Sequence, residues 1–321
     1  MKLYIDKENI KSILLGREEH MDLFWEIVTY IKKGLDVHYN FSKEEILKDK
    51  YIEAWFRTVK GFGVNTSSVY CPTESVFPQH PISKHFISQI SNNEDGIRSI
   101  YLIHGDKNII NSIEKKNVVL IGNEGEEYNV IQTLKAIEDK KDDIISVTIE
   151  SWKSYCPKAP VTDIILCDEH YFKNKETYRK NNNELITSIS SFANYQINLV
   201  VLTNPFNVDP KIKLSDECDK IKEQIRTAAN ISIDNCKVTI MTSDECHSRH
   251  LITNYYRINH TSCFHLIANG LKRDVTTGIV PNTSKKGFET TNALLKEFES
   301  IAKKINTHHY GDKKSNLIRF K

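Results

Sequence analysis

The chain has 321 residues, of which 39% are hydrophobic and 9% aromatic. This apolar content excludes a globally disordered chain, and the length favours two domains over one. The 44 basic and 42 acidic residues leave a net charge of +2, which excludes a strong overall field that would attract nucleic acid or an anionic membrane. Such binding would need a local patch.

The sequence predicts neither a membrane span nor an exported protein. No run of about eighteen apolar residues occurs, and Lys2, Asp6 and Lys7 place charges where a signal peptide would be apolar. The seven cysteines include no Cys-x-x-Cys pair, which argues against a zinc knuckle and a disulfide framework. We therefore expect a cytoplasmic protein with no membrane partner. Its many Lys, Ile and Asn residues are typical of an AT-rich bacterial genome.

Residues 1–95 are expected to form an α-rich domain of unknown role. Residues 3–5 predict a short strand, and residues 21–33 predict a helix because apolar side chains recur there at helical spacing. Ser42 and Glu45 form a capping box for a second helix, which carries Leu47 and Trp55 toward a core. Residues 61–93 contain three prolines and a weaker pattern, so we place the domain joint there and the boundary near residue 95.

Residues 96–321 are expected to form an α/β domain. Short β-rich runs at residues 100–104, 117–121 and 144–149 precede a regular alternation of strands and helices. In that alternation, strands at 161–167, 197–203 and 237–242 are separated by helices at 184–195 and 216–229. A strand pair at 250–255 and 262–267, a helix at 291–304 and a frayed tail beyond His308 complete the domain. This order predicts a mixed or mostly parallel sheet with helices on its faces.

Polar residues in the segment 245–265 fall at spacings used in phosphodiester chemistry. His247, Arg249, Asn254 and the Thr261-Ser262 pair occupy the positions of His, Lys, Asp and Gly-Ser in the phospholipase D motif. All spacings are kept, but only the His and the Ser keep their identity. The segment therefore resembles a single degenerate motif of the phospholipase D-like superfamily, and it is similar to phospholipase D-like domains that have lost catalysis and bind partners.

The resemblance implies a site of His247, Arg249, Asn254 and Ser262 that uses no cofactor and no metal. In an active enzyme of this family, the first His attacks phosphorus and a second His protonates the leaving group. A single-motif chain would complete that site only as a dimer. Asn254 cannot supply the family's carboxylate, so we expect a degenerate module that binds a nucleic-acid or protein partner, in a bacterial defence or nucleic-acid-processing pathway. The alternative is an active, metal-independent nuclease that works as a homodimer.

Further residues are candidates for binding phosphate or a partner. Asp168 and Glu169 follow an apolar run in the manner of a Walker B strand, but no phosphate-binding Gly-rich loop precedes them, so nucleotide hydrolysis is not expected. They remain candidates because open α/β sheets bind ligands at the carboxyl ends of strands. Tyr256 and Arg257 are candidates for stacking on bases, with core packing as the alternative. A basic loop after Asp168, including Lys173, can meet a phosphate backbone or be a solvated face.

Overall fold

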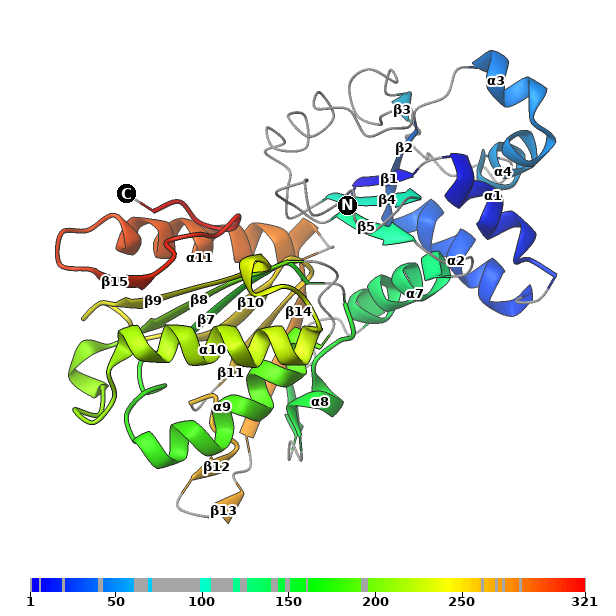
Figure 1. Cartoon of the computed structure of the whole chain (residues 1–321). Coiled ribbons are helices and arrows are strands. Elements are labelled where there is room, and N and C mark those ends of the chain that lie inside the picture. Colours follow the sequence, from blue (N-terminus) through cyan, green and yellow to red (C-terminus); the bar gives the residue numbers. More distant parts are fainter. Residues whose placement is uncertain are drawn as a thin grey trace. The chain divides into compact units, whose positions relative to one another are not determined.

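The computed structural model describes residues 2–5, 7–18, 21–39, 43–60, 69–70, 99–104, 118–121, 126–139, 144–147, 151–159, 161–191, 196–260, 263–268, 271–272, 275–282 and 285–320. Most of the proline-containing joint at 61–93, Ser42 and the Thr261-Ser262 pair lie outside these residues. The chain divides into two compact units, Met1–Ala136 and Ile137–Lys321, which Figure 1 draws in sequence colours.

The N-terminal unit contains the helices that the sequence predicts and also a parallel sheet that it does not. Its helices are α1 (Lys7–Leu15), α2 (Met21–Gly34), α3 (Lys43–Lys48), α4 (Lys50–Lys60) and most of α7 (Glu126–Asp139). Its strands are β1 (Lys2–Ile5), β2 (Asp36–Tyr39), β3 (Val69–Tyr70), β4 (Ser99–His104) and β5 (Val118–Ile121). They lie in the order β3-β2-β1-β4-β5, and all their pairings are parallel.

This pairing moves the division of the chain beyond residue 95. Strands β4 and β5, which we expected in the second domain, belong to the first sheet because β4 pairs directly with β1. A second difference concerns the predicted helix after Ser42, which is two helices. Asp49 separates them and accepts hydrogen bonds from the backbone N–H groups of Tyr51 and Ile52, so it caps α4. Trp55 is buried as expected, whereas Leu47 is exposed.

The C-terminal unit contains an eight-stranded mixed sheet in the order β15-β9-β8-β7-β10-β11-β14-β6. These strands are β6 (Ile144–Val147), β7 (Asp163–Asp168), β8 (Ile197–Thr203), β9 (Cys236–Thr242), β10 (Arg249–Thr253), β11 (Tyr256–His260), β14 (Val275–Pro281) and β15 (His308–Gly311). A separate pair is formed by β12 (Ile267–Ala268) and β13 (Leu271–Lys272). The helices are α8 (Trp152–Tyr155), α9 (Lys175–Ser190), α10 (Leu214–Ala229) and α11 (Lys285–Ala302), with short 3-10 turns η2 (Pro205–Asn207) and η3 (Ile233–Asn235).

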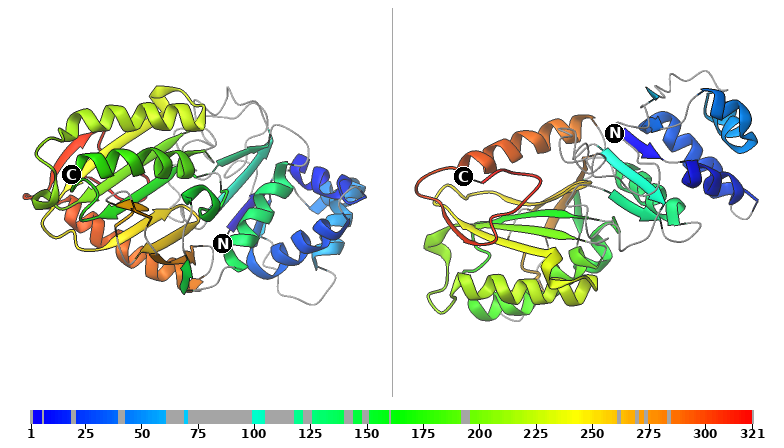
Figure 2. Two further views of the ribbon diagram at one scale, coloured as in Figure 1. Left: turned by 90° about the horizontal axis from the view of Figure 1, so that it is seen from below. Right: turned by 45° about the horizontal axis from the view of Figure 1, so that its top comes forward.

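The three central strands confirm the α/β prediction. Strand β8 pairs in parallel with both β7 and β9. Helices α9 and α10 cover one face of the sheet and α11 covers the other, as Figures 1 and 2 show. Every residue of β7 and β8 is buried, as expected for parallel strands covered on both faces. This double cover explains why these strands are continuous apolar runs.

The remaining strands are antiparallel, and two of them correct the sequence analysis. The hairpin after β9 exists, but its second strand is Tyr256–His260 and not residues 262–267. The tail beyond His308 is not frayed, because β15 pairs with β9 and places Tyr310 opposite Ile240. The tail then continues to Asn316, whose backbone N–H and side-chain Nδ2 donate to the Asp163 carboxylate at 2.7 and 2.9 Å. This buried acceptor holds the C-terminal segment against the start of β7.

Candidate functional site at the carboxyl end of β7

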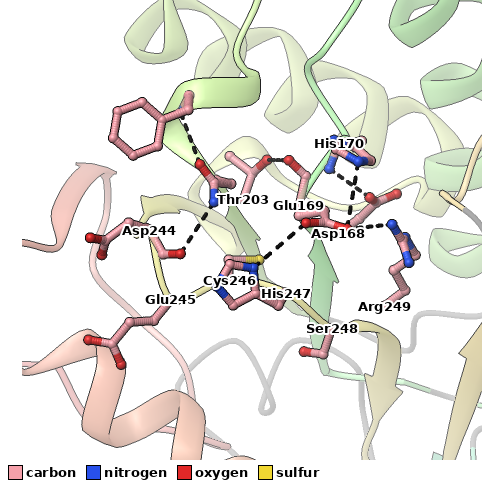
Figure 3. Close-up of polar contacts among 12 residues, drawn as sticks. Asp168, Glu169, His170, Thr203, Asp244, Glu245, Cys246, His247, Ser248 and Arg249 are labelled. Atoms are coloured by element: carbon pink, nitrogen blue, oxygen red, sulfur yellow. Dashed lines mark hydrogen bonds and ion pairs between the residues drawn. The ribbon is translucent and has the colours of Figure 1, made fainter.

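The register of β7 and β10 brings two motif segments together. Strand β10 runs antiparallel to β7, and Arg249 at its start lies opposite Asp168 at the end of β7. The turn Glu169–His170 and the loop Asp244–Ser248 therefore meet at this edge of the sheet, as Figure 3 shows. We refer to Glu169, His170, His247 and Arg249 as the Glu169 cluster.

Glu169 is the centre of this cluster. Its Oε1 accepts a hydrogen bond from a terminal nitrogen of Arg249 and lies 3.6 Å from Nε2 of His170. Its Oε2 lies 3.8 Å from Nδ1 of His247. The Glu169 side chain is 18% exposed, Arg249 24% and His247 72%. A carboxylate thus faces one guanidinium and two imidazoles at the surface (Figure 3).

His170 has a lowered pKa within the cluster. Burial lowers its pKa below 6.5, and the charges of Lys173 and Arg249 act in the same direction. Glu169 and a hydrogen bond with Asn207 oppose this shift without reversing it. Lys173 donates its backbone N–H to the His170 oxygen at 3.0 Å, so a second cation, on an exposed residue, lies near the cluster.

Asp168 is buried, and its hydrogen bonds hold the backbone next to the cluster. Its side chain is 0% exposed, which corrects the expectation that it contacts a partner. Its two oxygens accept the backbone N–H groups of His170 at 2.9 Å and Phe264 at 2.7 Å. Burial raises its pKa to about 6, although both hydrogen bonds and the Arg249 charge lower it. Asp168 therefore fixes the turn that carries His170.

The loop Asp244–Ser248 presents His247 because its neighbour Cys246 is anchored in the core. Cys246 is 1% exposed, and its sulfur lies 3.5 Å from the Cys167 sulfur and 3.5 Å from the backbone oxygen of Leu202. Its contact with Cys167 and its burial raise the pKa of the Cys246 thiol. The alternation of a buried cysteine and an exposed histidine directs His247 outward.

Asn254 does not belong to this cluster. It follows Thr253, which pairs with Ile164 near the start of β7, whereas Arg249 pairs with Asp168 at its end. At about 3.4 Å per residue, the five steps along the chain from Arg249 to Asn254 span about 17 Å. The Oδ1 atom of Asn254 accepts the backbone N–H groups of Thr162 and Asp163, each at 2.9 Å. The residue expected in the catalytic set is therefore a buried structural residue.

Two further candidates are also buried. Tyr256 is 0% exposed and Arg257 is 9% exposed within β11. Neither offers a surface on which a base can stack, so the core alternative is correct for this pair. Ser262 lies outside the described residues.

The end of β8 and the turn that follows it contain residues that the sequence analysis did not name. Thr203 donates from Oγ1 to the Glu169 backbone oxygen at 3.3 Å. Asn204 donates from Nδ2 to the Asp244 backbone oxygen at 3.3 Å. Both residues could have been predicted from the sequence. Strand β8 was expected to run parallel to β7, so its carboxyl end must lie at the same edge of the sheet. His170 was missed although it directly follows Glu169.

Chemically, the cluster can bind an anion and can hold an imidazole for proton transfer. Arg249 and Lys173 supply positive charge, and the two histidines supply ring nitrogens.

Within the described ranges, no group of three or more His, Cys, Asp and Glu side chains is arranged to hold a metal ion. None of the helices in the described part of the chain has the length and apolar character needed to cross a bilayer. Neither a protein-family model nor a curated protein matches this chain.

Proposed function

We propose that the C-terminal unit is a catalytically degenerate phospholipase D-like module that binds a phosphate group of its partner at the Glu169 cluster. The observation that supports this proposal is the meeting of Arg249, His170 and His247 around one partly exposed carboxylate at the end of β7. Bacterial defence or nucleic-acid processing is the setting that the motif resemblance favours.

Arg249 is suited to take a phosphate. A guanidinium has five N–H donors in a planar fork, and the contact with Glu169 uses one terminal nitrogen. The side chain is partly exposed but its Nε is buried, so a phosphate oxygen would approach through the terminal nitrogens. Glu169 competes with the phosphate for Arg249 and holds the guanidinium in place until the ligand arrives.

The position of Asn254 supports binding over catalysis. The residue that stands at the family's Asp position is committed to Thr162 and Asp163, at the far end of β10. Burial lowers the pKa of His170, the other histidine in the cluster. A smaller fraction of it is therefore protonated and able to act as a general acid for a leaving group.

The binding proposal predicts opposite effects for two substitutions. Arg249→Gln should weaken binding of inorganic pyrophosphate about tenfold because a charge-assisted contact is lost. Glu169→Gln should strengthen it about fivefold because a competing negative charge is removed. NMR titration of the histidine ring signals measures both. Arg226→Gln and Glu223→Gln are matched controls, since these residues form a surface ion pair on α10. If Arg249→Gln left the affinity unchanged, the proposed site would be wrong.

Metal-independent phosphodiester cleavage is a second candidate, favoured by one observation. Glu169 Oε2 lies 3.8 Å from His247 Nδ1, so it can provide the carboxylate that Asn254 cannot. Hydrolysis of bis(p-nitrophenyl) phosphate in excess EDTA tests this candidate. We expect no turnover. Turnover that disappears in His247→Ala would establish the enzyme and displace the binding proposal.

A further inference from the structure

Phe206 is an exposed aromatic side chain in the turn that follows β8. Its side chain is 85% exposed, and it occupies the middle of the 3-10 turn Pro205–Asn207. Single exposed apolar residues are common and need no explanation by themselves. Phe206 differs because of what the residues around it contact.

The residues around Phe206 connect it to both histidine segments. Asn204 accepts the backbone N–H of Phe206 at 3.0 Å and donates to Asp244, at the start of the loop that carries His247. On the other side, the turn is joined through the backbone to the segment that follows His170. The backbone N–H of Asp209 donates to the Phe172 oxygen at 2.9 Å there.

These contacts tie the turn to the segments that carry the Glu169 cluster. Asn204 is 6% exposed, and its two hydrogen bonds are partly buried. Pro205 restricts the backbone at the first position of the turn. The aromatic ring is thus displayed on a turn whose backbone is hydrogen-bonded to the His247 loop and to the segment after His170. Less backbone entropy is lost when a ligand stacks on such a turn than when it stacks on a mobile loop.

We propose that the partner is a single-stranded nucleic acid, with one base stacked on Phe206 and a neighbouring phosphate held by Arg249 and the histidines. This inference rests on the proposed phosphate site and names its ligand class. An unpaired base offers a flat aromatic face that Phe206 can cover, and an aromatic platform beside basic groups is the usual arrangement for single-strand binding. A duplex hides its base faces in the stack. A phosphorylated protein would engage the cluster without requiring an aromatic platform.

The test is a binding series with a fluorescein-labelled 12-nucleotide single strand, measured by fluorescence anisotropy with the full chain. Phe206→Ala should weaken binding about tenfold, while Phe206→Trp should keep it. Base stacking should also quench the emission of the new tryptophan. An abasic strand of the same length should bind wild type and Phe206→Ala equally. Ile233→Ala is the matched control, since Ile233 is an exposed residue in the 3-10 turn η3, before β9.

The outcomes separate this inference from the phosphate proposal. If Arg249→Gln weakens binding of the strand and Phe206→Ala does not, the base-stacking inference is overturned and the phosphate site stands. If wild type binds pyrophosphate but not the strand, the nucleic-acid assignment is wrong and a phosphorylated protein becomes the partner to test. If neither ligand binds, both proposals fail. Because Phe206 is exposed, loss of folding is not expected, and an unchanged melting temperature of Phe206→Ala verifies this.

Discussion

Replacing Asn254 with alanine should destabilise the C-terminal unit and leave the Glu169 cluster intact. The substitution removes the acceptor for two backbone N–H groups, those of Thr162 and Asp163 at 2.9 Å, and for the Thr162 hydroxyl at 3.3 Å. Thr162 is 2% exposed and Asp163 is 0% exposed, so bulk water cannot replace the lost acceptor. An unsatisfied buried group costs about 1–3 kcal/mol, and two such groups give a loss of about 3 kcal/mol.

Urea unfolding measures this loss. With a slope of about 2 kcal/mol per molar urea, the midpoint should fall by about 1.5 M. Trp152 is buried in the C-terminal unit and reports its unfolding, while Trp25 and Trp55 belong to the N-terminal unit. Amide hydrogen exchange at residues 161–168 should accelerate in parallel. Pyrophosphate affinity, measured well below the midpoint, should match that of wild type.

The substitution Asn254→Asp provides the sharper test, because it restores the residue type of the active family. Thr162 Oγ1 lies within hydrogen-bond distance of both the Asp163 carboxylate and the Asn254 oxygen, so the new carboxylate would stand close to Asp163. Like charges in a buried position repel, and we expect lower stability at pH 7 and no gain of phosphodiesterase activity. A gain of metal-independent cleavage, or an Asn254→Ala variant that keeps its stability and loses ligand binding, would refute the structural role of Asn254.

Three further predictions concern other parts of the C-terminal unit. Gly311→Ala should lower the free energy of unfolding by more than about 2 kcal/mol, because Gly311 has φ +91° and an added Cβ would lie 2.1 Å from the Val238 oxygen; the melting temperature measures this. Asp168 holds its proton more tightly in the folded protein, where its pKa is about 6, than in the unfolded chain, where its pKa is 3.8. Its contribution to the free energy of unfolding is therefore fully present below pH about 4 and is lost as pH rises through about 6. The change is about 3 kcal/mol, measured as the difference between the pH-stability curves of wild type and Asp168→Asn; parallel curves would contradict it. Cys167 and Cys246 should remain unmodified by a thiol reagent in the folded protein and react in 6 M urea, since both are buried; peptide mass spectrometry identifies the modified residues.

The sequence alone determined the central part of the C-terminal unit. The apolar runs at 161–167, 197–203 and 237–242 predicted three strands that share one sheet, because a strand covered on both faces must be apolar along its whole length. The same reasoning placed Glu169 at a carboxyl edge where ligands bind. These features follow from residue type and local spacing, which the sequence states directly.

Only the tertiary structure decided which residues are neighbours. The N-terminal sheet depends on pairing between β1 and β4, whose partner residues, such as Lys2 and Ser99, are 97 positions apart. Local periodicity carries no information about such partners. The spacing of His247, Arg249 and Asn254 suggested one site, yet the antiparallel register of β10 on β7 places Arg249 and Asn254 at opposite ends of the strand. The carboxylate beside His247 comes instead from Glu169, on another strand end. Register is set by burial of whole faces across the sheet. This nonlocal requirement explains why the sequence analysis named Glu169, His247 and Arg249 but also grouped Asn254 with them.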